Sequence, residues 1–240
     1  MKFIILFIAS LSFYRLGFAG QVNSRLDGIR AVFHFNEFTG QDAVDSRADV
    51  STGATLMLGA AFSRGVFGNG VSCDGVNDHV RVVRDSNIYD FPTPSSIEFW
   101  VKIRGPESQQ ADIMGTGTAD NEWLLYMTAG DPADVALYNN NGTPANVSVP
   151  FDFVRNEWAY IVLTYNGTTL SIYKDGDIGV NIASRIFAST SNPFRACATS
   201  GGANPANMEI DELIIWNKAL TPGEVKKRYA ESRSAFIVNQ

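Results

Sequence analysis

Hydrophobic and polar positions alternate along much of this chain, with the period of two that is typical of half-buried β-strands. In SSIEFWVKI, residues 95–103, every second residue from Ile97 to Ile103 is large and apolar. The pattern predicts an all-β fold of many short strands. Further segments of this kind, separated by Gly, Asp and Pro turn signals, are 31–36, 54–59, 71–83, 111–116, 122–128, 134–140 and 208–220.

The segment 156–179 predicts a β-hairpin followed by a third strand. Two runs rich in branched and aromatic residues flank Asn166 and Gly167, which together tolerate the positive φ angles of a two-residue type I′ turn. Asp175 and Gly176 supply a second turn signal. We therefore expect two strands joined at Asn166-Gly167 and another strand after Gly176.

The segment TPGEVKKRYAES, residues 221–232, carries the start signals of a helix. Thr221 can cap the first turn, Pro222 suits the first helical position, and Glu224 completes a capping box with Thr221. We expect one short helix here, on the outside of a sheet protein.

The composition is that of a folded protein, and it narrows the classes of partner. Hydrophobic residues make up 45% and charged residues 18% of the 240 positions, so the chain can bury a core. The net charge of −6 argues against nucleic acid as a partner, because phosphate binding needs clustered Lys and Arg. An acidic surface suits solubility, a neutral ligand such as a glycan, or a cation.

Residues 1–19 resemble a cleaved export signal. Lys2 precedes an apolar run, and small residues end the segment at Gly17 and Ala19. The run is too short to span a bilayer, although Arg15 is unusual in a signal and an uncleaved anchor is the alternative. We expect cleavage near Ala19 and a single domain over residues 20–240, in a secreted, periplasmic or cell-surface protein without a membrane span.

The chain has two cysteines, Cys73 and Cys197. In an oxidising compartment they could form one long-range disulfide, which would stabilise the fold by about 4 to 5 kcal/mol in the chain-entropy model. Two buried free thiols are the alternative, and the sequence leaves both open.

Five motifs follow one another along the chain: AVFHFNEFTGQDAVDSRA, CDGVNDHVRV, IEFWVKI, NEWAYIVLTYNGTTLSIYKDG and IDELIIWNKALTPGEVKKRY. In this order they resemble the laminin-G-like branch of the concanavalin A-like lectin and glucanase jelly rolls, with a pentraxin-related variant of the pattern. The resemblance covers about residues 31–229 and implies an all-β, two-sheet antiparallel jelly-roll sandwich with one C-terminal helix. Cys73 stands where the family usually has phenylalanine, which favours the disulfide alternative.

The same sandwich carries lectins, glycosidases and structural modules, so the fold does not decide the function. Glu209, Asp211 and Glu212 resemble the start of the catalytic strand of the glucanases, but the third carboxylate in alternation is missing. With a period of two, Glu209 and Asp211 share one face and Glu212 points to the other. We expect no enzyme activity, since no catalytic triad or zinc motif surrounds the histidines either.

The pentraxin-like stretch 113–127 implies a calcium site. In that branch an Asp-Asn pair before a strand supplies oxygen ligands, and Asp120-Asn121 stands at this place. The acidic loop that completes the pentraxin site has no counterpart before Glu209, so other oxygen ligands would have to fill the shell of the ion. Exposed turn residues without a metal are the alternative.

A glycan site is expected around Tyr138 and the asparagine loop after it. Sugars are recognised by an aromatic face and convergent amide or carboxylate groups, which Tyr138 and Asn140 could present beside Trp123, Asp120 and Asn121. The resemblance thus implies an exported, lectin-like, non-catalytic module that binds a glycan or cell-surface glycoconjugate. The alternatives are an adhesive or structural module that binds a protein and, less favoured, a glycoside hydrolase.

Overall fold

The computed structural model describes residues 28–47, 53–82, 94–105, 109–117, 122–129, 134–139, 145–182, 192–199 and 203–238. The expected export signal, and the expected site residues Asp120, Asn121 and Asn140, lie outside these ranges.

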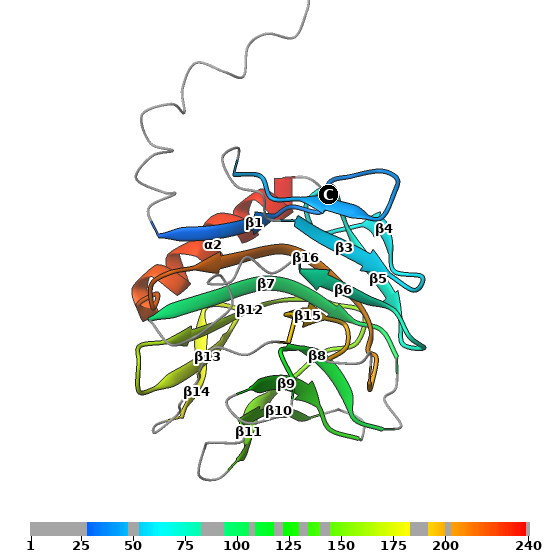
Figure 1. Cartoon of the computed structure of the whole chain (residues 1–240). Coiled ribbons are helices and arrows are strands. Elements are labelled where there is room, and N and C mark those ends of the chain that lie inside the picture. Colours follow the sequence, from blue (N-terminus) through cyan, green and yellow to red (C-terminus); the bar gives the residue numbers. More distant parts are fainter. Residues whose placement is uncertain are drawn as a thin grey trace, which may run out of the picture.

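Sheet A is antiparallel and has eight strands among the described residues, in the order β14-β13-β12-β7-β16-β5-β4, with β1 beside one half of β16 (Figure 1). Its centre is formed by β7 and β16, the segments with the strongest strand patterns in the sequence. The strands are β1 (Ile29–Phe33), β4 (Ala61–Arg64), β5 (Asn69–Asp74), β7 (Ser95–Ile103), β12 (Trp158–Tyr165), β13 (Leu170–Lys174), β14 (Asp177–Ile182) and β16 (Asn207–Trp216).

Sheet B is also antiparallel, with eight described strands in the order β11-β10-β9-β8-β15-β6-β3-β2. The two-residue strand β15 lies between β6 and β8 in the middle of the sheet. The strands are β2 (Asp42–Val44), β3 (Gly53–Met57), β6 (His79–Val82), β8 (Ala111–Gly115), β9 (Trp123–Met127), β10 (Asp134–Asn139), β11 (Asn146–Asp152) and β15 (Arg195–Ala196).

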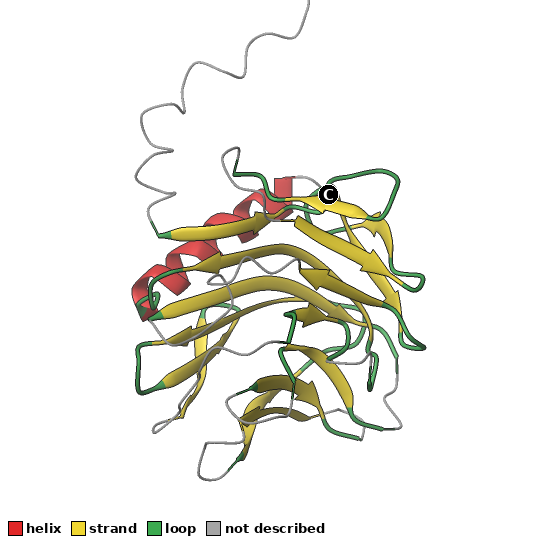
Figure 2. Cartoon of the chain, viewed as in Figure 1, coloured by secondary structure: helices red, strands yellow, loops and turns green. Residues whose placement is uncertain are grey.

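The core lies between the two sheets and takes alternate residues from strands of both. On β7, every second residue from Ile97 to Ile103 points into it, as the alternation predicted. On β9 and β10 the core residues include Leu125 and Leu137. The predicted jelly-roll sandwich is therefore confirmed, and Figure 2 shows strands throughout its body.

The predicted hairpin is confirmed, but its two-residue type I′ turn is wrong. Four residues, 166–169, connect β12 to β13, and only Gly167 has a positive φ, at 103°. The Asn166 side chain accepts hydrogen bonds from the backbone N–H groups of Thr168 and Thr169, which stabilises the longer turn. The tight turn lies at the next connection, where Asp175 and Gly176 both have positive φ.

Helix α2 (Pro222–Val238) packs on the outer face of sheet A, opposite the core (Figure 1). The predicted capping box is present: the Thr221 N–H donates to Glu224 Oε2 at 2.8 Å, and the Glu224 N–H donates to Thr221 Oγ1 at 3.3 Å. The Tyr229 ring stacks on Tyr160 of β12. The helix is longer than predicted, and it covers the outer face of sheet A.

A disulfide joins Cys73 of β5 to Cys197, which directly follows β15, with a Cα–Cα distance of 6.3 Å. The bond therefore crosses the core from sheet A to sheet B. Of the two alternatives for the cysteines, the structure contains the bonded one.

Candidate functional site

The register of sheet B aligns six residues in one row on its outer side, with polar or aromatic residues at both ends and the buried Gly115 and Leu124 between them. Alternate residues on these strands belong to the core, so the side chains in the row point away from sheet A. Adjacent strands lie about 4.8 Å apart, so the row from β6 to β11 is about 24 Å long. We call this set the sheet B row: Arg81, Arg195, Gly115, Leu124, Tyr138 and Asn146.

One end of the row combines two tyrosines with an amide. Tyr138 pairs directly with Asn146, and both side chains reach the surface. Tyr126 lies on β9 two residues after Leu124 of the row, so its side chain is on the same face. Its hydroxyl donates a hydrogen bond to Asn146 Oδ1 at 3.1 Å. Two partly exposed aromatic rings beside an oriented amide form the kind of surface that binds a sugar ring.

Asp112 on β8 anchors the segment that follows β15. Its carboxylate is 0% exposed and accepts hydrogen bonds from Thr199 Oγ1 at 2.7 Å and Gln110 Nε2 at 2.9 Å. Burial raises the pKa of Asp112, while these two hydrogen bonds lower it. Asp112 is the register partner of Tyr126, and its charge, after burial, raises the pKa of that phenol. The Asp112 carboxylate thus fixes the segment that follows β15, close to Arg195 of the row.

The other end of the row is basic. Arg195 of β15 and Arg81 of β6 are register partners with outward side chains. Arg195 Nη1 donates to the Thr199 carbonyl oxygen at 3.1 Å, which connects it to the Asp112 anchor. Sequence reasoning missed both arginines as a pair, because β15 is too short to show an alternation.

Of the predicted site residues, Tyr138 lies in the row, and its role in binding stays a prediction. Trp123 is corrected: its side chain is 2% exposed and packs against Phe194 with 5.9 Å between ring centroids, so it has no free face for a ligand. The alternation along β9 could have predicted this burial, because Trp123 alternates in step with Leu125 and Met127, which are also core residues. Tyr126, of opposite parity, is the outward aromatic residue of that strand.

The acidic segment on β16 is arranged differently from the prediction. The register with β7 shifts between Asp211 and Ile214, and Glu212 has a φ of 51°. Through this bulge Glu212 lies on the outer face of sheet A with Asp211, while Leu213 points into the core. The expectation that Glu212 faces away from Asp211 is therefore wrong, because a period of two does not survive a bulge.

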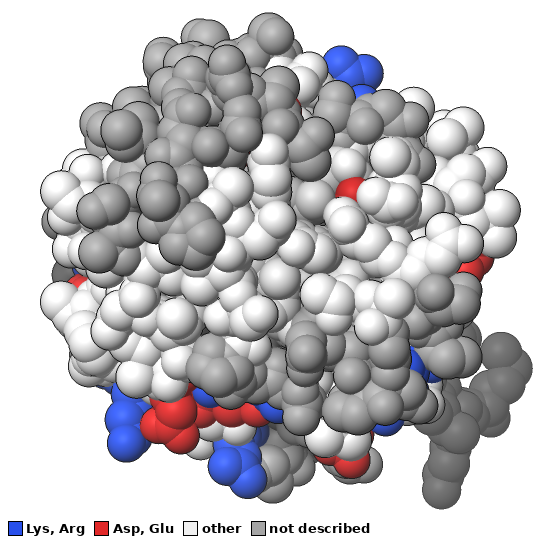
Figure 3. All heavy atoms as spheres, turned by 90° about the horizontal axis from the view of Figure 1, so that it is seen from below, with Lys and Arg blue, Asp and Glu red and all other residues white. Residues whose placement is uncertain are grey.

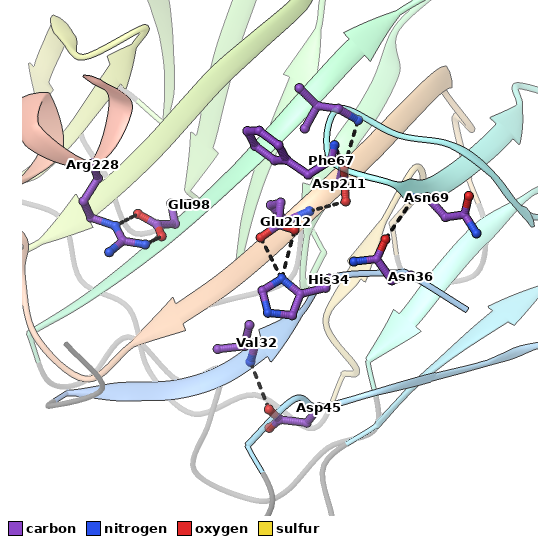
Figure 4. Close-up of polar contacts among 11 residues, drawn as sticks. Val32, His34, Asn36, Asp45, Phe67, Asn69, Glu98, Asp211, Glu212 and Arg228 are labelled. Carbon is purple, nitrogen blue, oxygen red and sulfur yellow. Dashed lines mark hydrogen bonds and ion pairs between the residues drawn. The ribbon is translucent and has the colours of Figure 1, made fainter. Parts of the chain in front are cut away.

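Asp211 holds a turn rather than a ligand (Figure 4). Its Oδ2 accepts hydrogen bonds from the backbone N–H groups of Val66 and Phe67 at 2.9 and 3.0 Å, and its Oδ1 accepts one from Glu212. Burial raises its pKa to about 8 against the lowering effect of these donors. Glu209 forms ion pairs with Lys102 and Arg104. Neither carboxylate is therefore arranged as a general acid beside an open cleft.

Glu212 pairs with His34, whose Nδ1 lies 2.8 Å from Glu212 Oε2. This contact raises the pKa of His34, against the opposing effect of burial. Nearby, Glu98 forms an ion pair with Arg228 of α2, as Figure 4 shows, and accepts a hydrogen bond from the Tyr160 hydroxyl at 2.6 Å. These contacts fasten α2, and the segment that follows β1, to the centre of sheet A.

A pocket of about 60 Å³ lies beneath α2, between this helix and sheet A. A cavity that holds a benzene ring has about 150 Å³, so this pocket fits water molecules and not a sugar. The outer face of sheet B is therefore the better candidate for a glycan. The pocket is lined by Phe67, Glu98, Trp100, Tyr160, Glu212, Ile214, Arg228 and Ser232.

The family model described as the concanavalin A-like lectin/glucanases superfamily matches residues 74–226. The chain belongs to this superfamily. That match covers the motifs from the loop after Cys73 to the first turns of α2 and confirms the resemblance found in the sequence. No curated protein matches the sequence significantly.

Solved structures of this superfamily fold are similar in their backbone. Domain 4 of AbnA, a GH43 extracellular arabinanase from Geobacillus stearothermophilus in complex with arabinotriose, matches with a TM-score of 0.64 and 16% identity, over 83% of this chain and 97% of that one. The binding domain of Paraclostridial Mosquitocidal Protein 1 matches with a TM-score of 0.67 and 15% identity, over 85% and 52%.

A third match is a botulinum neurotoxin type C structure, from work on cell entry that depends on interaction with two ganglioside molecules. Its TM-score is 0.65 at 14% identity, over 88% of this chain and 53% of that one. The chain thus spans about half the length of both toxin chains. At such identities, the likeness shows a shared fold.

Over the part of the chain that the structure describes, no helix is long and apolar enough to cross a bilayer. In the same part, no three His, Cys, Asp or Glu side chains gather as metal ligands. The expected calcium ligands Asp120 and Asn121 lie outside it, so the calcium site stays a prediction.

Proposed function

We propose that the protein is an exported, non-catalytic carbohydrate-binding module whose glycan lies on the sheet B row. The observation that carries this proposal is the arrangement of Tyr126, Tyr138 and Asn146. Two partly exposed rings offer apolar faces to a sugar ring, while the amide, oriented by the Tyr126 hydroxyl, offers hydrogen bonds to sugar hydroxyls.

The character of the surface supports this choice. Figure 3 looks from below onto the end of the sandwich where the edge strands β11 and β14 lie, and the described surface there is mostly uncharged, with charged side chains gathered towards one edge. β11 carries Asn146, so the aromatic end of the row adjoins this uncharged surface. On the outer side of sheet A, α2 covers part of the sheet and leaves the small pocket described above.

The similar structures support the class of ligand. The arabinanase domain was solved with arabinotriose, and the neurotoxin work concerns gangliosides, so glycans are bound by proteins that contain this fold. The absence of catalysis is part of the proposal. It is supported by Glu209 and Asp211, whose carboxylates are held by Lys102, Arg104 and backbone N–H groups.

Export through residues 1–19 and calcium at Asp120-Asn121 remain proposals. Calcium near the start of β9 could order the loop beside the aromatic end of the row, because Trp123 follows Asn121 by two residues. If so, glycan binding should weaken when the ion is removed.

The test is binding of the purified protein to a broad glycan array, with calcium and again with a chelator. Binding that weakens in the chelator supports both the module and the ion, and binding indifferent to the chelator supports the module alone. Silence under both conditions would contradict the proposed function and favour the alternative, an adhesive module that binds a protein.

A further inference from the structure

Two arginines face each other on the outer face of sheet B. Arg81 and Arg195 are direct register partners on adjacent strands, and both side chains point away from the core. Arg81 is exposed and Arg195 is partly buried. Like charges directly opposite each other in a sheet are destabilising, so this pair costs stability unless something lies between the two cations.

Neither guanidinium is neutralised within the described part of the chain. No ion pair joins Arg81 or Arg195 to a carboxylate there, and the contact that Arg195 makes is with a neutral carbonyl, that of Thr199. Its buried Nε has no hydrogen-bond partner in the described residues. Burial and then the charge of Arg81 lower the pKa of Arg195, which shows that the two cations lie in each other's field.

An excess of basic residues does not explain the pair. The sequence has 25 acidic and 19 basic residues, so acidic partners are plentiful. Other buried or partly buried cations have them: Arg228 pairs with Glu98, Arg104 with Glu209, and Arg47 with Asp45. The partly buried Arg195, by contrast, lies beside a second arginine, Arg81, and makes no ion pair with a carboxylate of the described residues.

The pair is held in place. Arg195 sits on β15, next to the disulfide at Cys197, and Thr199 is hydrogen-bonded to the buried Asp112. The Cys197 N–H also donates to the carbonyl of Ile113 on β8 at 2.9 Å. A guanidinium whose backbone is fixed in this way loses less entropy when it binds an anion.

We propose that Arg81 and Arg195 bind an acidic group of the glycan, a carboxylate or a sulfate ester. The proposal rests on the proposed function and narrows its ligand to acidic glycans. A guanidinium presents a planar fork of donors that matches the oxygen pairs of both groups. The bound anion would remove the repulsion between the arginines.

The spacing suits one ligand that reaches both ends of the row. Tyr138 lies three strands from Arg195, about 14 Å away. Gly115 and Leu124, which lie between them in the row, are buried, so the arginine pair and the aromatic end are two separate exposed patches. An oligosaccharide long enough to span about 14 Å could place a sugar ring on Tyr138 and an acidic group between the arginines.

Matched probe pairs test the proposal. In one pair, oligogalacturonate is compared with its methyl ester, which removes the carboxylate charge; in the other, a sulfated galactan is compared with its desulfated form. The acidic member of at least one pair should bind about tenfold or more tightly than the neutral one, as expected for a charge-assisted hydrogen-bonded pair. The pair that shows this preference identifies the anion.

Arg81→Gln and Arg195→Gln should each abolish that preference, so that the acidic probe binds no more tightly than the neutral one. Arg64→Gln is the matched control, because Arg64 is an exposed arginine on β4 of the other sheet. The unfolding midpoint separates lost binding from lost folding, and Arg81→Gln should not lower it, since it removes a like-charge contact.

The outcomes separate this inference from the proposed function. Suppose that neutral glycans bind and that this binding depends on Tyr138. The inference alone would then be overturned if no acidic probe were preferred, or if the preference survived both arginine variants. Absence of binding to any glycan would overturn both. An arginine-dependent acidic preference that is unaffected by Tyr138→Ala would keep the anion site and overturn the aromatic one.

Discussion

Cys73 and Cys197 tie sheet A to the two-residue strand that carries Arg195. β15 is too short to hold its place by pairing alone, and the chain after it is fixed by the disulfide, by the Cys197 hydrogen bond to Ile113, and by Thr199 on Asp112. The bond therefore stabilises the fold and positions one end of the sheet B row.

Replacing both cysteines, in Cys73→Ala/Cys197→Ala, should lower the free energy of unfolding by about 2 to 5 kcal/mol, because the unfolded chain regains the freedom of a long loop. Denaturant unfolding, with and without a reductant, measures this. The reductant should shift the wild-type midpoint and leave the double variant unchanged. An equal midpoint for both proteins under oxidising conditions would refute the stabilising role.

Asp211→Ala should destabilise the protein by about 2 to 4 kcal/mol, because buried backbone N–H groups of Val66 and Phe67 lose their acceptor. Asp211→Asn keeps one acceptor oxygen and should cost less. Denaturant unfolding of the two variants ranks them. If Asp211→Ala left stability intact but removed glycan binding, Asp211 would belong to the binding site instead.

The pKa of His34 should lie above 6.5, since the side-chain hydrogen bond to Glu212 is its largest cause of change. A raised folded-state pKa gives stability that is fully present below pH 6.5 and is lost as the pH rises from there through the raised pKa of the folded state. An NMR titration of the His34 ring measures the pKa, and Glu212→Gln should return it towards 6.5. A wild-type pKa at or below that value would contradict the pairing.

No glycan that binds should be hydrolysed. Incubation with the strongest ligand, followed by a reducing-sugar assay, should show no turnover above a blank, because Glu209 is engaged by Lys102 and Arg104. Glu209→Gln provides the check. A hydrolysis that occurs in the wild type and disappears in Glu209→Gln would make the protein an enzyme.

The sequence predicted the elements whose signals are local. Alternation located β7 to the residue, and the capping box at Thr221 and Glu224 located the start of α2. It misjudged the turn at Asn166-Gly167, because a favourable pair for a tight turn does not prevent a longer loop capped by the Asn166 side chain. The start of an element depends on adjacent residues, whereas a turn must also satisfy the register of its strands.

The site was predictable only in part, since it depends on register between distant strands. Tyr138 could be chosen from its own segment, but Arg195 and Arg81 are 114 positions apart in the numbering (195 − 81) and meet only through the pairing of β15 with β6. The bulge at Glu212 also lies beyond a period-two argument. Trp123 was misassigned because its parity on β9, and not its residue type, places it in the core.

The most direct test of the account is titration calorimetry of the array's strongest glycan against wild type, Tyr126→Ala, Tyr138→Ala and Phe38→Ala. Phe38 is 86% exposed and precedes β2, at the sheet edge opposite β11, so it is a matched aromatic control. An aromatic contact contributes about 1 to 1.5 kcal/mol, so loss of one stacked ring should weaken the affinity for the glycan by about tenfold. Phe38→Ala should leave the affinity unchanged. Undiminished binding by both tyrosine variants would contradict a glycan site on the outer face of sheet B.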